Sequence, residues 1–192
     1  MHVARVHESQ HYLTPKEDQP ELLPFVRMTQ SRAKSVRITS IAHATEDAEK
    51  VVQAVLSICP EDFPRVIQTE RVKGHYGNEI IICHLRAVGR SASERFFENL
   101  WRKMSSHDKS RIYDQVQEHV DGSGTLHLRI DKQEASKGKI RLQDNEPVKV
   151  EIMFKTLDKS EESRVEMVKR RMEALSKTCC LRRANLPEIT VQ

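Results

Sequence analysis

Apolar and polar residues alternate in six short runs between residues 36 and 154, and each run predicts a β-strand. Two of the runs flank the short connection from Gly74 to Gly77. Glycines at both ends of so short a segment favour a β-hairpin, because glycine accepts positive φ at low cost. The predicted strands are residues 36–41, 65–73, 78–88, 125–130, 139–142 and 148–154.

Apolar residues at helical spacing separate these strands. Between Ala48 and Leu56 they recur every three or four positions, which predicts one apolar helix face, and Pro60 ends that helix. The other helical predictions are a helix opening at residue 91, one over 108–119, a single turn over 131–135 and a charged helix over 160–177.

Two helix N-termini carry predicted caps. Thr45 precedes the acidic pair Glu46 and Asp47, which complements the exposed N–H groups and the helix dipole. Ser91 and Glu94 have the spacing of a capping box.

Together these elements predict an α+β fold with a mostly antiparallel sheet and helices packed on one face. The predicted order is β-α-β-β-α-α-β-β-β, followed by a C-terminal helix. Residues 1–33 show no sustained period and contain three closely spaced prolines, which predicts an irregular extension. We therefore divide the chain into this extension, an α+β domain over 34–155, and a charged helix and tail over 156–192.

Composition narrows the class of protein. The chain has 192 residues, of which 38% are hydrophobic, and no apolar run approaches the ~18 residues that cross a bilayer. The N-terminus lacks the apolar segment of a secretory signal. Four cysteines form no CxxC pair, so we expect reduced thiols and a cytoplasmic location. A net charge of +4 neither provides nor forbids a clustered basic surface.

The sequence contains none of the common catalytic signatures: no P-loop, no GxSxG, no GxGxxG and no HExxH. Asp131 and Glu134 are spaced for acid–base work or magnesium, but a helix cap and a solvated carboxylate explain them more simply. A nuclease or RNA-modifying enzyme using these two residues and a histidine is the least favoured hypothesis. We expect a non-catalytic protein with no cofactor and no metal.

The hairpin connection is the first candidate recognition segment. Lys73, His75, Tyr76 and Asn78 offer a cation, an imidazole, an aromatic ring and an amide, which suit a sugar–phosphate backbone or an RNA base. The alternative is an ordinary hairpin turn in which His75 and Tyr76 cover the sheet edge.

The second candidate segment follows the strand over 125–130. A helical turn begins there, and its exposed N–H groups favour an anion. The candidate contacts are Arg129, Lys132, Gln133, Lys137 and Lys139. The alternative is a solvated turn of mixed charge, because nearby carboxylates offset part of the positive charge.

Three motifs in this order carry a family resemblance: residues 41–47, Gly74 to Asn78, and Leu128 to Ala135 followed by Gly138. Over residues 35–155 the chain resembles an archaeal RNA-binding family described as a predicted exosome-associated subunit, with a fold like a ribosomal 5S-RNA-binding protein. The resemblance adds His43, within the first motif, to the candidate RNA contacts.

The resemblance implies RNA as the partner and no cofactor, with exosome or ribosome-related proteins and a second copy of the chain as further candidate partners. The leading hypothesis is a binding module that grips structured RNA through its backbone and shape. The alternative is a scaffold or assembly protein acting through the helix over 160–177. The leading hypothesis requires the hairpin and the cationic turn to share one solvent-facing, net-positive surface.

Overall fold

The computed structural model describes residues 32–155 and 160–184. The predicted irregular extension lies almost entirely outside the described residues, although Ala33 already belongs to the first strand. The elements are β1 (Ala33–Ala42), α2 (Ala48–Ser57), β2 (Ile67–Lys73), β3 (Glu79–Val88), α3 (Arg90–Lys103), α4 (Ser106–Asp114), α5 (Val116–His119), β4 (Thr125–Ile130), α6 (Lys132–Ser136), β5 (Val148–Phe154) and α7 (Glu161–Ala184).

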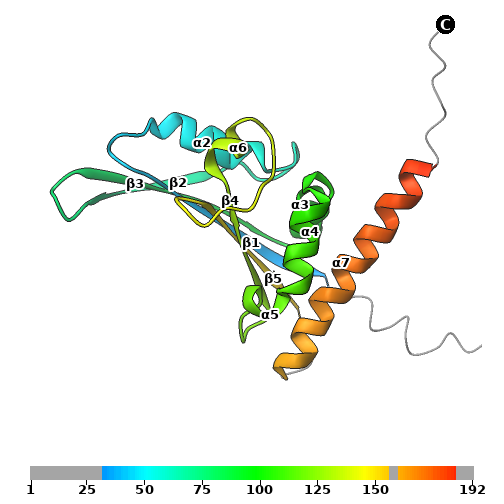
Figure 1. Ribbon diagram of the computed structural model, residues 1–192. Helices are drawn as coiled ribbons and strands as arrows, with labels where there is room; N and C mark the ends of the chain where they lie inside the picture. The colour runs from blue at the N-terminus through cyan, green and yellow to red at the C-terminus, as the bar shows by residue number, and fades with distance from the viewer. Residues whose placement is uncertain (1–31, 156–159, 185–192) are drawn as a thin grey trace, which may run out of the picture.

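The five strands form one sheet in the order β2-β3-β1-β5-β4, and every neighbouring pair is antiparallel. Figure 1 shows α2 and α6 packed over one end of this sheet and α3, α4 and α7 beside them. The arrangement confirms the predicted α+β fold with an antiparallel sheet, helices and a C-terminal helix. No helix within the described residues is long and apolar enough to span a membrane.

The sheet has two chemically different faces, because successive side chains of a strand point to opposite sides. One face packs under the helices and is apolar: Ile38, Leu85 and Val150 are fully buried in cross-strand register. The residues between them point to the opposite side, which we call the open face. It carries polar and charged residues such as Arg37 and Arg86.

The C-terminal helix α7 contributes apolar side chains to the main hydrophobic core. Val168 and Met172 are fully buried in the same apolar cluster as the sheet residues. Trp101 Nε1 donates a hydrogen bond to Ser176 Oγ at 3.1 Å, and Arg171 pairs with a carboxylate of α3. The described side chains of α7 therefore pack against the α+β domain.

Two elements differ from the sequence-based predictions. The predicted strand over 139–142 forms only two isolated bridges, from Ile140 and from Leu142, because a ladder never develops beside β4. The predicted helix over 108–119 is split into α4 and α5 at Gln115.

Both predicted N-caps are also wrong. The cap of α2 is Asp47, whose side chain accepts from the Glu49 N–H at 2.9 Å, and not Thr45. The capping box at Ser91 does not form, since α3 begins earlier. Glu94 is buried and accepts from the Ala33 N–H at 2.7 Å.

Candidate nucleic-acid interface

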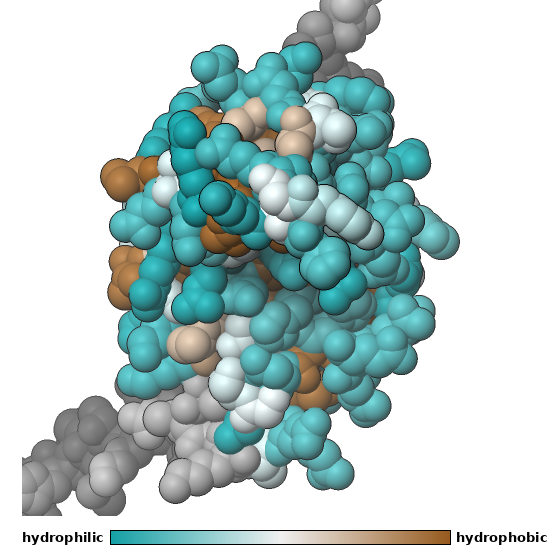
Figure 2. Space-filling model, turned by 90° about the vertical axis from the view of Figure 1, so that its left-hand side faces the viewer, coloured by the Kyte–Doolittle hydropathy of each residue, from teal (hydrophilic) through white to brown (hydrophobic). Residues whose placement is uncertain are grey.

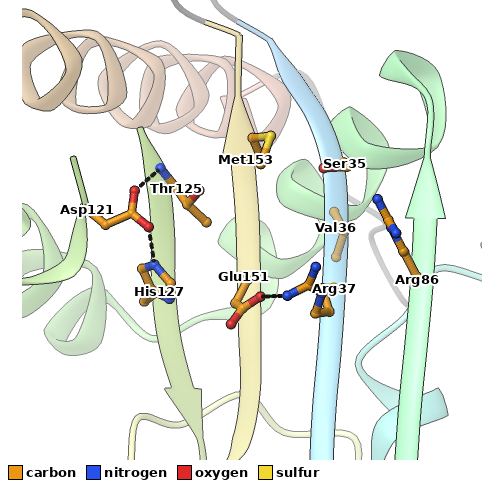
Figure 3. Close-up of a pocket in the computed structure, with 9 residues that line it drawn as sticks. All are labelled: Ser35, Val36, Arg37, Arg86, Asp121, Thr125, His127, Glu151 and Met153. Carbon is orange, nitrogen blue, oxygen red and sulfur yellow. Dashed lines mark hydrogen bonds and ion pairs between the residues drawn. The ribbon is translucent and has the colours of Figure 1, made fainter. Parts of the chain in front are cut away.

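A row of charged side chains crosses the middle of the open face (Figure 3). Asp121 Oδ2 lies 2.8 Å from His127 Nε2 at one end of the row. Glu151 and Arg37 face each other on β5 and β1, with a distance of 3.2 Å between Oε2 and Nη1. Arg86 on β3 ends the row, opposite Arg37 in the strand register. The row therefore contains the carboxylates of Asp121 and Glu151 and ends in two neighbouring cations, Arg37 and Arg86.

The pairing of Arg37 with Arg86 is electrostatically unfavourable in the free protein, because like charges directly opposite on a sheet repel. A second like-charge pair occurs on the same face, where Arg129 on β4 is opposite Lys149 on β5. Within the described residues, neither Arg86 nor Lys149 has a hydrogen-bond or ion-pair partner.

These four cations form two directly opposite pairs joined by one diagonal step from Arg37 to Lys149, and we call this row the basic path. It runs from Arg86 on β3 through Arg37 on β1 and Lys149 on β5 to Arg129 on β4. With neighbouring strands ~4.8 Å apart, the path spans about 14 Å of the open face. An extended arrangement of this kind matches a polyanion better than a single small anion.

A cavity of about 280 Å³ lies beside the charged row. Ser35 explains part of its shape, because this small side chain stands in register between Val88 and Met153 and leaves a hollow between them. Met153 is 37% exposed and forms an apolar wall. The cavity is lined by Ser35, Val36, Arg37, Arg86, Asp121, Thr125, His127, Glu151 and Met153.

Asp121 is held rigidly at the edge of this cavity. Its partial burial alone would raise the pKa of the carboxyl group, but hydrogen bonds from Ser123, His127 and Thr125 outweigh that effect and the pKa lies well below its usual value. The two backbone N–H donors lie 2.8 and 2.9 Å from Oδ1. Asp121 therefore stays ionised and fixes the orientation of the His127 ring.

His43, Glu46 and Glu146 form a group whose ligand atoms lie within 4.8 Å of one another. The Glu46 carboxylate is already engaged, because Lys132 Nζ lies 2.8 and 2.7 Å from its two oxygens. Burial alone would raise the pKa of Glu46. The hydrogen bonds from Lys132 and from the His43 N–H lower the pKa by more than burial raises it, so the pKa lies below its usual value. The arrangement is an ion-pair network in which an ammonium group occupies the place that a cation would take.

The predicted hairpin contacts lie where β2 and β3 project beyond the end of β1 (Figure 1). Lys73, His75 and Tyr76 are exposed, and the Tyr76 side chain is 93% exposed. Asn78 is half-buried, and its side chain lies so close to Gly74 that a Cβ atom there would meet Oδ1 at 2.5 Å. A larger residue at Gly74 would therefore displace the Asn78 side chain.

The predicted contacts of the cationic turn are dispersed. Arg129 lies on the open face, while Gln133, Lys137 and Lys139 are exposed on or after α6. Lys132 is only 8% exposed, and besides Glu46 its ammonium group donates to the backbone carbonyl of residue 41 at 2.9 Å. Lys132 therefore stabilises the interior of the fold and is not exposed to a ligand.

The structure brings the two predicted segments to the same end of the sheet but not to one site. The hairpin belongs to β2 and β3 at one edge, and the turn follows β4 at the other, with β1 and β5 between them. His43 and Lys132 do come together, since both bind Glu46. Three cations of the open face, namely Arg37, Arg86 and Lys149, were not predicted from the sequence. Each is a basic residue at a polar position of an alternating strand, and that position was the sequence signal that could have identified it.

A family model described as RNA binding matches residues 35–155. The RNA-binding protein PAB1135 of Pyrococcus abyssi is 32% identical over 146 residues, which cover 74% of this chain and 95% of that protein.

Two solved structures described under the family label DUF54 share the fold. Protein AF2318 from Archaeglobus fulgidus superposes with a TM-score of 0.65 at 28% identity, covering 73% of this chain and 99% of its own. Protein SSO0741 from Sulfolobus solfataricus gives a TM-score of 0.58 at 27% identity, covering 77% and 98%. The match of the family model and the identity to the archaeal relative show that this chain belongs to the family described as RNA binding.

Proposed function

We propose that the protein binds structured RNA through its open face, mainly by contacts between the basic path and the sugar–phosphate backbone. The observation that carries this proposal is that two like-charge pairs, Arg37 with Arg86 and Arg129 with Lys149, stand opposite each other in the strand register on a face that no described helix covers. Repulsion between such neighbours is relieved when phosphate groups bind between them. Membership in the RNA-binding family and the name of the archaeal relative support RNA as the polyanion.

Shape also favours a rigid, structured ligand. The basic path lies on four paired strands, so the Cα atoms of its cations keep a constant spacing. Recognition of an RNA helix depends on backbone geometry more than on base edges. The hairpin of β2 and β3 projects beyond the sheet and presents Lys73, His75 and Tyr76 to the same ligand. Figure 2 shows that the side of the molecule at this end is largely hydrophilic, with apolar groups in separate small areas.

The proposal is tested by the salt dependence of binding to an RNA hairpin. Each neutralised phosphate contributes ~0.7–0.9 to the slope of log affinity against log salt. Replacing Arg86 and Lys149 together by Gln lowers that slope by about 1.5 and weakens binding at low salt, because two phosphate contacts are lost.

The matched control is the double change Lys50→Gln and Lys103→Gln, which removes the same charge from α2 and α3 in the helical layer. It leaves the slope unchanged. A flat salt dependence of the wild-type protein, or an equal loss in both double variants, contradicts RNA binding by the open face.

The scaffold hypothesis has less support from the packing of α7. Its apolar residues Val165, Val168 and Met172 are buried in the protein's own core and are not offered to a partner. The two carboxylates of the enzymatic hypothesis are also engaged: Asp131 accepts from the Glu134 N–H at 2.8 Å, and Glu134 pairs with Lys137 at 2.7 Å. Association with the exosome or ribosome-related proteins, a homodimer and a cytoplasmic location stay predictions.

A further inference from the structure

The cavity on the open face differs in chemistry from the basic path that borders it. Its wall combines the apolar Met153, the hydroxyl groups of Ser35 and Thr125, and the carboxylate of Glu151. A site for phosphate alone has no use for an apolar wall and is weakened by a carboxylate. This mixture of apolar, hydrogen-bonding and charged groups is typical of pockets for small organic ligands.

We infer that the cavity receives one unpaired nucleotide of the bound RNA, with its base against Met153 and its phosphate at Arg86. This inference rests on the proposed function and names the feature of the RNA that the open face selects. A volume of about 280 Å³ is near the lower limit for a small-ligand pocket, which suits a single nucleotide and excludes a base pair.

The base has a defined place because Ser35 leaves a hollow in the row Val88, Ser35, Met153 and Thr125. Val88 is 68% exposed on one side of the hollow, and Met153 stands on the other. A thioether side chain adapts its shape to flat apolar groups. The hydroxyl groups in the same row supply donors and acceptors for the edge of a base.

Arg86 and Glu151, at the border of the cavity, are available for the phosphate and for the polar groups of the nucleotide. Arg86 has no partner within the described residues, so its guanidinium group is available for two parallel hydrogen bonds to a phosphate. Glu151 uses Oε2 for Arg37, and no described group binds its other oxygen, which is an acceptor for a ribose hydroxyl or a base amino group. Asp121 Oδ1 already accepts three hydrogen bonds, from the N–H and hydroxyl groups of Ser123 and the N–H of Thr125, and Oδ2 lies 2.8 Å from His127 Nε2.

An uninterrupted RNA helix keeps its bases stacked and cannot fill the cavity. Proteins that read RNA bases therefore select bulges, loops and ends, where a nucleotide can leave the stack. The cavity predicts that this protein prefers RNA with an unpaired nucleotide beside a helical segment.

The test compares two RNA hairpins that differ only by a single bulged nucleotide in the stem. The wild-type protein binds the bulged hairpin about tenfold more tightly, as expected for burial of one apolar group against Met153. Ser35→Leu fills the hollow and removes this preference. Ser35→Ala leaves the hollow open and lowers the preference only by the loss of one hydroxyl contact, whereas Met153→Ser lowers it several-fold by removing the apolar wall.

The readout is the ratio of the two affinities, so a partly unfolded variant lowers both values and leaves the ratio interpretable. Equal wild-type affinities for the two hairpins overturn the inference while RNA binding stands. A preference that survives Ser35→Leu also overturns it, because the nucleotide then binds elsewhere. Absence of salt-sensitive binding to either hairpin contradicts the proposed function itself. A wild-type dimer that Ser35→Leu dissociates, with equal affinities for both hairpins, assigns the face to a second copy.

Discussion

Arg86 lies near the end of β3 and Lys132 begins α6 just after β4, and these two cations have opposite environments. Arg86 is exposed, faces another arginine and has no partner within the described residues. Lys132 is buried and binds both oxygens of Glu46 as well as a backbone carbonyl. An uncompensated exposed cation is available to a ligand, whereas a compensated buried one stabilises the protein. Charge in the sequence therefore marks a binding surface only after burial and pairing are known.

The largest effect is expected on the stability of the protein when the buried cation, Lys132, is replaced. Lys132→Met leaves the Glu46 carboxylate half-buried without its counter-charge and lowers the free energy of unfolding by about 2–3 kcal/mol, less than the full loss for a completely buried pair. Urea denaturation measures this change. The affinity of the folded variant for an RNA hairpin stays close to that of the wild type.

The double change Lys132→Met with Glu46→Gln serves as its control. It recovers part of the stability, because the amide carries no charge and still accepts from the His43 N–H. If Lys132→Met weakens RNA binding and leaves the unfolding free energy unchanged, the assignment of Lys132 to the interior is wrong.

A smaller effect is expected at Asp121, on the edge of the cavity. Its depressed pKa means that the folded state favours the ionised carboxyl, so the stabilisation is fully present above the ordinary value of 3.8 and is lost as the pH falls toward the lowered value. Asp121→Asn is therefore less stable than the wild type by about 1 kcal/mol at neutral pH. That difference shrinks in acid.

Denaturation at a series of pH values measures both results. Asp144→Asn is the control, because that carboxylate is 71% exposed and makes only long contacts of 3.7 and 4.0 Å with two arginines. A stability difference between Asp121→Asn and the wild type that is constant down to pH 2 would show that the charge of Asp121 has no role.

Local patterns predicted the strands well because alternation depends on neighbouring residues and on which face a strand buries. The same patterns failed at the caps. Glu94 has the spacing of a capping box, but its actual partners are the Ala33 N–H and Arg171, 61 and 77 residues away in the sequence. Tertiary partners of this kind outweigh a local preference and leave no signal near the residue.

The candidate site was harder to predict for a related reason. Arg37, Arg86 and Lys149 are ordinary basic residues at polar strand positions, and only the register of β3, β1 and β5 places them side by side. Lys132 looked like a member of an exposed cationic turn, although its partner Glu46 lies 86 residues earlier. The hollow at Ser35 likewise depends on three strands at once.

On the exposed side of the comparison, Glu151 is the carboxylate that competes with RNA for Arg37. Glu151→Gln removes a negative charge from the open face and frees that guanidinium group, so affinity for an uninterrupted RNA hairpin rises about threefold at low salt. A shift assay at several salt concentrations measures the gain, which disappears as salt rises. Glu49→Gln on α2 gives no such gain, and equal gains in both variants would reduce the effect to net charge.

The smallest effect on stability is expected at Lys137, which lies in the same turn as Lys132. Lys137 pairs with Glu134 at 2.7 Å, and this contact raises the pKa of the lysine, but its side chain is 60% exposed and the pair is accessible to solvent and salt. Lys137→Gln therefore leaves the urea midpoint of unfolding unchanged within error, although Lys132→Met shifts it strongly. A comparable loss at both positions would mean that charge in the turn, and not burial of one ammonium group against Glu46, stabilises this end of the sheet.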